Sequence, residues 1–436
     1  MKTAPAAKLA DWTLLIYMAG DNDLDDFGAE DIKEMKKVGS SDRIHILVQR
    51  DTAAAGIPAY RYRVQKGTAM KDDVLMDLGE TNTGDPKVLE DFLTWGMKHY
   101  PAQRTMAVLW NHGSGWDDTD IYAEARHRNL RPGDVKPAGS AARRSGVVGR
   151  AALPPTFVRK GKPATRRYRT SFFLSAFEMA PASGKQPRRA IAFDDEAQDF
   201  LDSVEMKNVF TRITKKYGRK FDLIGMDACL MSMIEPVFQV QKCGSVFCGS
   251  QESEPGKGWP YDKVLAKLAK QPAMSGAQLA TIIVDEYSAS YPASKAVTQT
   301  ALDLTKLTGV QQAVDALGLI LKTNLKTAAG GINFSLHGQI SAARKEAQGY
   351  DHPDYVDLCD FADKLAAYWP KAAAAAKNIR AAVKACVIAN RAKHAQVRRS
   401  NGISIYLPLV EVNALYAKLD FANGNWHAFL KAYHNA

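Results

Sequence analysis

Short runs of consecutive, mainly apolar residues recur through the first part of the chain. The first three are Thr13–Met18, Ile44–Val48 and Met106–Trp110. Runs of this length suit strands that are covered on both faces, as in a parallel sheet with crossover helices. Residues 25–37 and 86–100 lie between these runs and carry apolar residues at helical spacing. The pattern therefore predicts strands that alternate with helices.

The same alternation returns after a break in the middle of the chain. Ala190–Phe193, Phe221–Met226 and Val246–Gly249 are predicted strands, and helices are expected over residues 198–217 and from about Met231. Repeated strand–helix units of this kind predict an α/β/α sandwich around a mostly parallel sheet.

Beyond about residue 265 the pattern changes to alanine-rich helices. Residues 277–291 and 368–389 are examples, and Ile403–Pro408 is an isolated late strand. A chain of 436 residues is long enough for two structural units. We expect an α/β domain over residues 8–265 and a mainly helical C-terminal domain over residues 266–436.

The break, residues 126–189, accounts for the basic character of the chain. The net charge is +11, from 58 Lys and Arg against 47 Asp and Glu, and this segment holds 16 of the basic residues but two of the acidic ones. It has little apolar periodicity, so we expect a mobile insert. Electrostatic binding to nucleic acid or another anionic partner is an alternative. No recognition motif or interleaved aromatic residues accompany the charge, so no nucleic-acid partner is expected.

The cysteines and the hydropathy of the chain argue against several classes of protein. Five cysteines without CxxC spacing argue against a disulfide framework or a zinc site. No apolar stretch reaches the roughly 18 residues that a membrane span needs. No signal peptide is recognisable, so we expect a cytoplasmic protein, or a secreted one whose export signal has been removed.

Two reactive side chains follow predicted strands directly. His112 comes after the run that ends at Trp110, and Cys229 comes after the run that begins at Phe221. Ligands of open α/β sheets bind at the carboxyl ends of the strands, so neighbouring strands would bring the two residues together. A histidine beside a cysteine activates the thiol and later protonates a leaving amine. Gly113 allows a close approach of its backbone N–H to an oxyanion.

The ordinary alternatives are a buried, inert cysteine and a histidine that serves only as a polar residue. The spacing favours the chemical interpretation. His112 and Cys229 are 117 positions apart, and 53 remain when the 64-residue insert is left out. Caspase-type peptidases place the histidine about 50 residues before the cysteine.

The sequence resembles the clostripain family of cysteine peptidases at five motifs in the same order. They are Tyr17–Leu24, Leu78–Pro86, the His112 and Cys229 segments, and Gln251–Trp259. The resemblance implies a caspase-like fold and hydrolysis of peptide or protein substrates. We expect the protein to be a monomer. It implies that His112 is the general base and acid and Cys229 the nucleophile. The amides of Gly113 and Cys229 would form the oxyanion hole, and cleavage in the insert would mature the enzyme.

The resemblance also bears on specificity, because the family prefers Arg or Lys before the scissile bond and binds it with acidic residues. Asp227 matches one of these acids, whereas Lys257 stands at the position of a second. Glu252 and Glu254, in the same segment, are further candidate substrate-binding residues. An ammonium group in place of a carboxylate should weaken binding of a cationic side chain, so we expect altered specificity. The alternative is that Lys257 points to solvent.

The acidic loop 21–26 raises the question of a metal. Calcium dependence is known in the family, but the loop lacks the glycine and the distal glutamate of an EF-hand. A solvated turn at a helix N-terminus is the favoured interpretation. We expect no metal or organic cofactor in the chemistry. The competing function is a non-catalytic binding protein on a peptidase scaffold, with the basic insert as its interaction arm.

Overall fold

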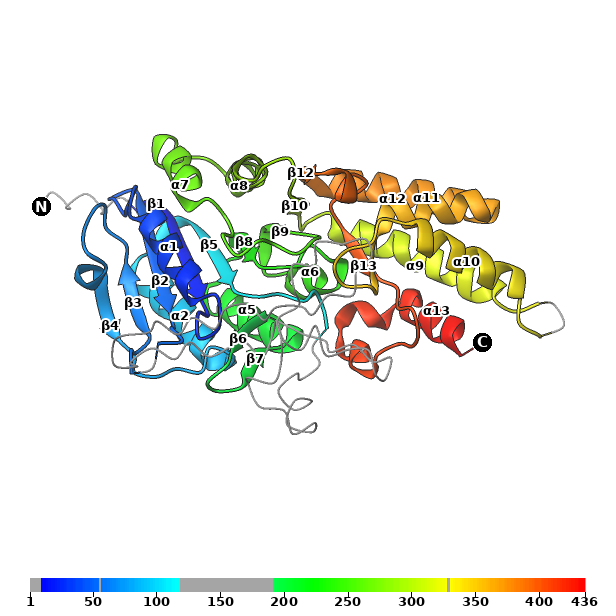
Figure 1. The fold of residues 1–436 in the computed structure, drawn as a ribbon, viewed down its shortest axis with the longest axis horizontal. Coiled ribbons are helices and arrows are strands. Elements are labelled where there is room, and N and C mark those ends of the chain that lie inside the picture. Colours follow the sequence, from blue (N-terminus) through cyan, green and yellow to red (C-terminus); the bar gives the residue numbers. More distant parts are fainter. Residues whose placement is uncertain (1–8, 55, 118–190, 328–329, 436) are drawn as a thin grey trace, which may run out of the picture.

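The computed structural model describes residues 9–54, 56–117, 191–327 and 330–435. A nine-stranded sheet crosses the molecule in the order β12-β10-β9-β8-β5-β1-β2-β3-β4 (Figure 1). Its strands are β1 (Ala10–Met18), β2 (Ile44–Arg50), β3 (Tyr60–Arg63), β4 (Val74–Asp77), β5 (Ala102–Trp110), β8 (Phe221–Asp227), β9 (Gly244–Gly249), β10 (Val297–Asp303) and β12 (Val387–Lys393).

The five central strands of this sheet are parallel. β1 pairs with β2 and β5, and β8 pairs with β5 and β9, all in parallel register. The outer strands on both sides, β3, β4, β10 and β12, are antiparallel to their neighbours. The fold class is confirmed as a mixed α/β sandwich with a mostly parallel sheet.

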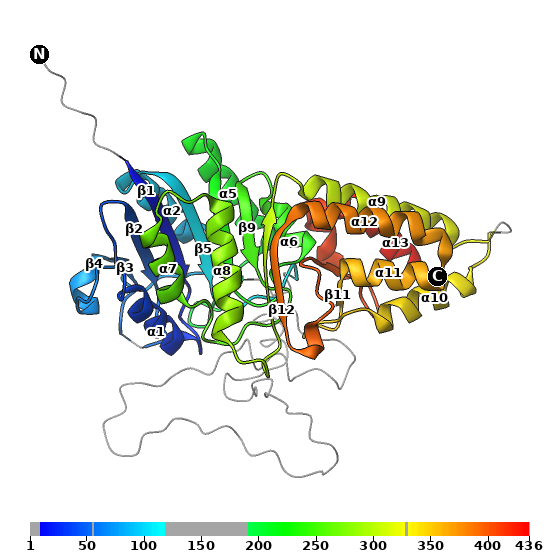
Figure 2. The same ribbon diagram turned by 90° about the horizontal axis from the view of Figure 1, so that it is seen from above.

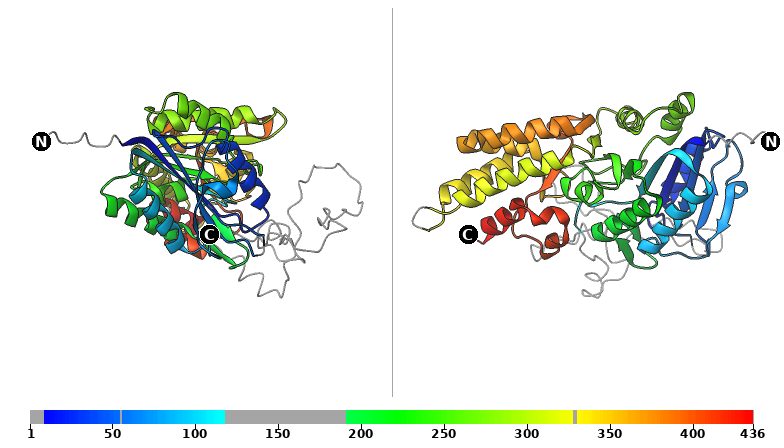
Figure 3. Two further views of the ribbon diagram at one scale, coloured as in Figure 1. Left: turned by 90° about the vertical axis from the view of Figure 1, so that its left-hand side faces the viewer. Right: turned by 180° about the vertical axis from the view of Figure 1, so that it is seen from behind.

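Helices cover both faces of the sheet (Figures 2 and 3). One face carries α1 (Asp25–Met35), α7 (Tyr261–Lys270) and α8 (Gly276–Ser290), and the other carries α2 (Pro86–His99), α5 (Ser203–Tyr217) and α6 (Ile234–Val240). The side chains of β1 show why helices must cover both faces of the sheet. Leu15 and Tyr17 join one buried cluster, and Leu14, Ile16 and Met18 join the other. A strand whose successive side chains are all apolar is stable only between two layers.

Local sequence signals set the ends of several helices. At the start of α2 the Asp85 carboxylate accepts a hydrogen bond from the amide of Lys87, and Pro86 occupies the first turn. At α5, Asp202 and Glu205 form a capping box, and Gly218 ends the helix in the left-handed region at φ 62°.

The C-terminal part adds a helical layer beyond the end of the sheet (Figure 1). It contains α9 (Leu307–Asn324), α10 (Phe334–Glu346), α11 (Leu358–Tyr368), α12 (Ala373–Cys386) and α13 (Asn425–His434). Its buried residues belong to the same apolar cluster as α2, α5 and α6. Because β10 and β12 also come from this part, the central sheet extends across residue 265, where we expected a boundary between domains.

Two small sheets and five short 3-10 helices complete the described chain. β6 (Ile191–Asp194) and β7 (Asp199–Leu201) form a hairpin outside the central sheet, and β11 (Tyr355–Asp357) pairs with β13 (Ser404–Tyr406). The 3-10 helices are η1 (Met70–Asp73), η2 (Pro370–Ala372), η3 (Ala395–Val397), η4 (Ala414–Lys418) and η5 (Asp420–Asn423).

Two predictions for particular segments can be compared with these elements. The helix expected over residues 368–389 stops at Cys386, because the following residues pair with β10 as β12. The strand expected at Ile403–Pro408 is present as β13 and pairs with β11. The insert 126–189 lies outside the described residues. No disulfide joins the five cysteines, all of which are described. Within the described ranges, no helix is both long and apolar enough to cross a bilayer.

Candidate active site

His112 lies two residues beyond the end of β5, directly beside the end of β8. Trp110 of β5 is in register with Asp227 of β8, and the amide of Asn111 donates to the carbonyl of Asp227 at 3.3 Å. The Asn111 side chain accepts a hydrogen bond from the amide of His112 and donates one to the carbonyl of Ala19. These contacts hold the backbone of His112 against the loops that follow β1 and β8.

The imidazole of His112 is buried and contacts a carboxylate from the loop after β1. Its Nε2 atom lies 2.7 Å from Oδ1 of Asp23. Asn22 shapes this loop, because its Nδ2 donates to the carbonyl of Ala19 at 3.0 Å and its Oδ1 accepts from the amide of Leu24 at 3.0 Å. From the sequence we expected this acidic loop to start a helix or to hold a cation, and we did not connect it with His112.

Cys229 lies two residues beyond the end of β8 and is half-buried, whereas the other four cysteines are buried. The amide of Glu254 donates to Sγ of Cys229 at 3.2 Å. The next residue, Leu230, adopts the left-handed conformation with φ 65°, and its amide donates to the carbonyl of Glu252 at 3.3 Å. A non-glycine residue in this region marks local strain, which often occurs at functional sites.

Gly113 shows that the His112 and Cys229 loops are in direct contact. A Cβ atom placed on Gly113 would lie 2.4 Å from the carbonyl oxygen of Cys229 and 3.0 Å from Cβ of Ala228. Only glycine fits so close to a backbone oxygen. The structure therefore brings the two loops together at the carboxyl ends of neighbouring parallel strands.

Asp227 is buried next to the Cys229 loop. Its Oδ2 accepts hydrogen bonds from the hydroxyl of Tyr261 at 2.9 Å and from the amide of Trp259 at 3.3 Å. Burial raises the pKa of Asp227 to about 6, although these two donors favour its charged form. Gly258, at φ 51°, passes so close that a Cβ there would lie 2.8 Å from Oδ1 of Asp227.

The charge of Asp227 acts on two further carboxyl groups, those of Glu254 and Asp31. Burial, and next the charge of Asp227, raise the pKa of Glu254 well above its usual value. The same two causes raise the pKa of Asp31, on α1, which accepts a hydrogen bond from Nε1 of Trp110 at 2.7 Å. Asp31 was not among the residues predicted from the sequence. It lies on the buried face of α1 with Gly28, Ile32 and Met35, and an acid at such a position is a recognisable signal.

Lys257 and Glu252 do not belong to this group of carboxyls. Lys257 is exposed. Glu252 is buried and accepts hydrogen bonds from the amides of Ser253 at 2.8 Å and Asp351 at 3.1 Å. Burial raises the pKa of Glu252 to about 7. Of the four candidate substrate-binding residues, Asp227 and Glu254 are thus close together.

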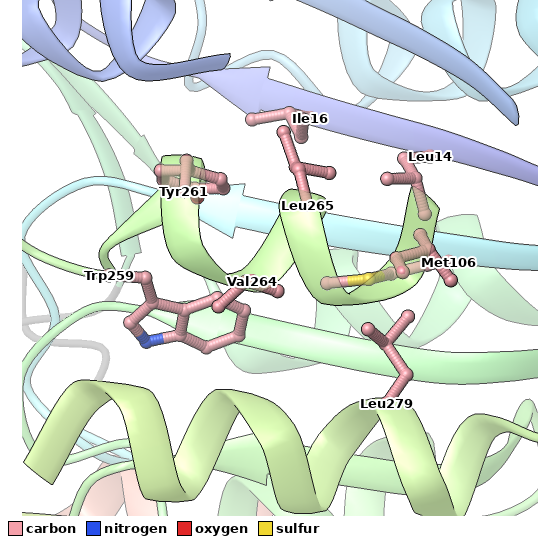
Figure 4. A pocket seen from close by; sticks show the side chains of 9 residues that line it. Leu14, Ile16, Met106, Trp259, Tyr261, Val264, Leu265 and Leu279 are labelled. Carbon is pink, nitrogen blue, oxygen red and sulfur yellow. The ribbon is translucent and has the colours of Figure 1, made fainter. Parts of the chain in front are cut away.

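An apolar cavity lies between the sheet and α7, and Trp259 and Tyr261, which both hydrogen-bond Asp227, are among its lining residues (Figure 4). Leu14, Ile16 and Met106 line it from the sheet, and Leu265 and Trp259 close it from the other side. The side chain of Trp259 thus belongs to the core, while its amide faces Asp227.

Three other carboxylates come within reach of one another near the end of β1. Asp21, Glu80 and Glu196 each offer an oxygen, and these oxygens lie within 4.8 Å of one another. Oxygen ligands of this type suit calcium, so these residues could hold such a cation. The other acids of the loop have different partners, since Asp23 contacts His112 and Asp25 pairs with Arg50. A site formed by the whole loop 21–26 is therefore not what the structure shows.

The C-terminal part holds the loop that carries His112. The hydroxyl of Tyr355 donates to the carbonyl of Ser114 at 2.6 Å. Trp116 is fully buried, with ring centroids 4.7 Å from Tyr406 and 4.8 Å from Tyr416 in edge-to-face geometry. Contacts of this kind stabilise aromatic clusters beyond their buried area.

The same part of the chain also holds the segments around Cys229. Oγ of Ser232 donates to the carbonyl of Gly402 at 2.7 Å, and the amide of Gly402 donates to Oε1 of Gln251 at 2.7 Å. Nε2 of Gln251 in turn donates to the buried carboxylate of Asp357 at 3.1 Å. Both loops of the candidate site are therefore supported by residues far downstream in the sequence.

The fold and the site define a class, the cysteine peptidases with a caspase-like α/β/α sandwich. A family model described as the clostripain family matches residues 16–128 and 179–431. The chain belongs to this family, and it is a cysteine endopeptidase by membership.

Individual relatives agree with this assignment at low sequence identity. Clostripain of Hathewaya histolytica is 22% identical over 463 residues, covering 91% of this chain and 74% of that protein. A secreted C11 cysteine protease from Bacteroides thetaiotaomicron, solved with an irreversible peptide inhibitor, has a TM-score of 0.59 at 18% identity, covering 95% of this chain and 99% of the other. An inactive zymogen of a C11 protease from Parabacteroides distasonis has a TM-score of 0.61 at 17% identity, covering 98% and 100%. At these identities the two structures support the fold.

Proposed function

We propose that the chain hydrolyses peptide bonds with Cys229 as the nucleophile and His112 as the general base and acid. The close approach of Gly113 to the carbonyl of Cys229 is the observation that supports this most strongly. It joins the two loops that follow β5 and β8, which are parallel neighbours. Proton transfer between a thiol and an imidazole requires them to come within hydrogen-bond reach.

The proposed reaction has two halves. The thiol proton passes to His112 and the Cys229 sulfur attacks the carbonyl carbon of the scissile bond. The amides of Gly113 and Cys229 donate hydrogen bonds to the oxyanion that forms. His112 then gives its proton to the leaving amine, and a thioester remains on Cys229. A water molecule, deprotonated by His112, attacks the thioester carbonyl and releases the acid and the free thiol.

Asp227 and Glu254 support a first specificity pocket that is acidic. Glu254 is linked to the nucleophile by its amide, and its carboxyl group interacts with that of Asp227. A cationic side chain before the scissile bond would complement these groups.

Lys257 opposes this preference, and we propose that it weakens binding of Arg or Lys without reversing it. Its exposure argues against the large penalty of a like charge in a desolvated pocket. The exposed ammonium still adds positive charge to the segment that carries Glu254.

Cleavage within residues 126–189 is the proposed maturation step. This segment is rich in arginine and proline and lies in the sequence between the two catalytic positions. A chain cut there would remain joined by the sheet, because β5 and β8 pair directly. Weakened preference for Arg would slow self-cleavage. The inactive variant Cys229→Ala can show who makes the cut, because it would stay uncut if the enzyme cleaves itself and would still be cut if another protease does so.

The proposal is tested with four proteins, the unchanged chain, His112→Ala, Cys229→Ala and Cys243→Ala. Each is assayed with fluorogenic peptides that vary at the residue before the cut. Cys243 is buried and serves as the matched control. We expect His112→Ala and Cys229→Ala to lose activity by at least about 100-fold, the lower contribution of a positioned acid–base group. Full activity in folded Cys229→Ala would exclude this mechanism.

The rival function, a non-catalytic binding protein that uses the basic insert on an anionic partner, predicts no hydrolysis of any peptide in the panel. We further propose peptide or protein substrates and a monomeric enzyme. Sedimentation of the active protein tests the monomer, which a stable dimer would contradict.

A further inference from the structure

We propose that Asp23 is the positioning residue of His112, an inference that rests on the dyad proposed above. The proposal rests on the contact between Oδ1 of Asp23 and Nε2 of His112, which are 2.7 Å apart. The two residues are 89 positions apart and come from the loops after β1 and β5. The contact of Asp23 is with the imidazole, so Asp23 would act on Cys229 through His112.

An acid in this loop could instead cap helix α1 or pair with a lysine or arginine, but within the described residues Asp23 does neither of these. Leu24 is the N-cap of α1, and no side chain makes a capping hydrogen bond there. Asp25 pairs with Arg50, and Oδ2 of Asp21 accepts a hydrogen bond from the amide of Glu196 at 3.0 Å. Asp23 is therefore the member of the loop that is directed to the histidine.

The loop is built to keep Asp23 in this place. Asn22 is 1% exposed, and both ends of its side-chain amide bond the loop backbone. The amide of Ala19 donates to the carbonyl of Trp110 at 3.2 Å, which ties the end of β1 to the end of β5. The side chain of Asn111 adds a second tie between the same two loops. A carboxylate held by this framework has a fixed position relative to the imidazole, and the His112 side chain is 7% exposed.

This geometry selects one state of the ring. A carboxylate accepts only, so the neutral imidazole carries its proton on Nε2, facing Asp23. The lone pair then lies on Nδ1, which is the atom that takes the proton of the Cys229 thiol. When His112 becomes an imidazolium, its charge is 2.7 Å from the carboxylate, which stabilises it until the proton passes from Nδ1 to the leaving amine.

The test compares Asp23→Asn with Asp26→Asn, which removes the same charge from an exposed residue three positions later. We expect Asp23→Asn to lower kcat by about 100-fold with KM changed by less than about twofold, because the ring is misdirected while substrate contacts remain. Asp26→Asn should match the unchanged enzyme. Asp23→Glu, which keeps the charge, should retain more activity than Asp23→Ala.

A spectroscopic readout separates positioning from a merely structural role. Nitrogen-15 spectra of the neutral imidazole, recorded at alkaline pH in the Cys229→Ala background, report which ring nitrogen carries the proton. The signal of His112 is identified by its loss in His112→Ala. We expect the Nε2-protonated form with Asp23 present and a mixture of tautomers with Asn at this position.

The outcomes distinguish this proposal from the dyad itself. Unchanged kcat in Asp23→Asn, with His112→Ala inactive, overturns the role of Asp23 and leaves the dyad standing. Activity that survives both His112→Ala and Cys229→Ala overturns the dyad. If Asp23→Asn does not fold, the spectrum of the protein with Asp23 intact still decides, because a proton on Nδ1 contradicts the proposal.

Discussion

The hydroxyl of Tyr355 donates a 2.6 Å hydrogen bond to the carbonyl of Ser114, two residues after His112. This bond spans 241 positions and joins the C-terminal part of the chain to the loop that carries His112. Both residues are buried. The C-terminal layer therefore contributes to the order of the candidate active site, and its contacts should influence turnover as well as stability.

Replacing Tyr355 by Phe tests this link. The change removes one buried donor, so the free energy of unfolding should fall by about 1–2 kcal/mol. Because the loop after His112 loses an anchor, kcat should fall roughly threefold to tenfold. Chemical denaturation and steady-state kinetics measure the two effects. Tyr368→Phe is the matched control, since Tyr368 bonds Glu346 at the exposed surface. Equal effects of the two changes would contradict a role for Tyr355 in the site.

Gly113→Ala should disable the site while the fold remains. The added Cβ would lie 2.4 Å from the carbonyl oxygen of Cys229, so the two loops must separate. We expect kcat/KM to fall by at least about 100-fold, because a displacement of about 1 Å costs this much. Gly309→Ala has open space at its Cβ and should leave kcat/KM unchanged. An active Gly113→Ala enzyme with an unchanged circular dichroism spectrum would show that this contact is not required.

Specificity should respond to Lys257 in a graded way. For peptides with Arg before the cut, we expect kcat/KM to rise about threefold in Lys257→Ala and about tenfold in Lys257→Asp. These factors correspond to about 0.7 and 1.4 kcal/mol, the size expected for partly screened charges. Peptides with Glu should change in the opposite direction. Lys263→Asp, an exposed lysine on α7, controls for overall charge. An Arg-to-Glu ratio that does not move in either Lys257 variant would rule out its effect on the pocket.

Rising pH should destabilise the protein through Asp21. Burial, and next the neighbouring Asp194, raise the pKa of Asp21 to about 9, so the folded state holds a proton that the unfolded chain releases near pH 4. The folded state then binds more protons between these values, and stability falls as pH increases through this window, by at most about 1.4 kcal/mol per pH unit.

The measurement is the difference in melting temperature between the unchanged protein and Asp21→Asn from pH 6 to pH 9. Asparagine resembles the protonated acid, so the variant should lose less stability over this range. Asp26→Asn, at an exposed position, should follow the unchanged protein. Parallel curves for the protein and Asp21→Asn would show that this group does not titrate as inferred.

Much of the central fold could be predicted because its strands are unbroken apolar runs. β1, β2, β5, β8 and β9 coincide with such runs, and the class and family expected from the sequence are confirmed. The outer strands lack this signal. β10 and β12 contain polar residues throughout, and β12 follows an alanine-rich helix without a breaker, so local pattern extended that helix too far. Pairing with a neighbour decides such strands, and pairing is not visible in local sequence.

The positions of the candidate site residues could be predicted where they follow a strand, but their contacts could not. His112 and Cys229 follow recognisable strands, but their roles remain predictions, as does the oxyanion hole. The contact of Asp23 with His112 depends on the meeting of two loops 89 positions apart, and no local pattern reports it. The exposure of Lys257 likewise depends on the turn formed around Gly258, where the backbone approaches Asp227.

The central claim is that the thiol of Cys229 attacks substrate with the help of His112. It is tested most directly by treating the protein with a peptidyl halomethylketone and locating the adduct by peptide mass mapping. We predict one adduct, on Cys229, which forms at least about 100 times more slowly in His112→Ala. An adduct on another residue, or labelling of Cys229 at the same rate without His112, would contradict the account.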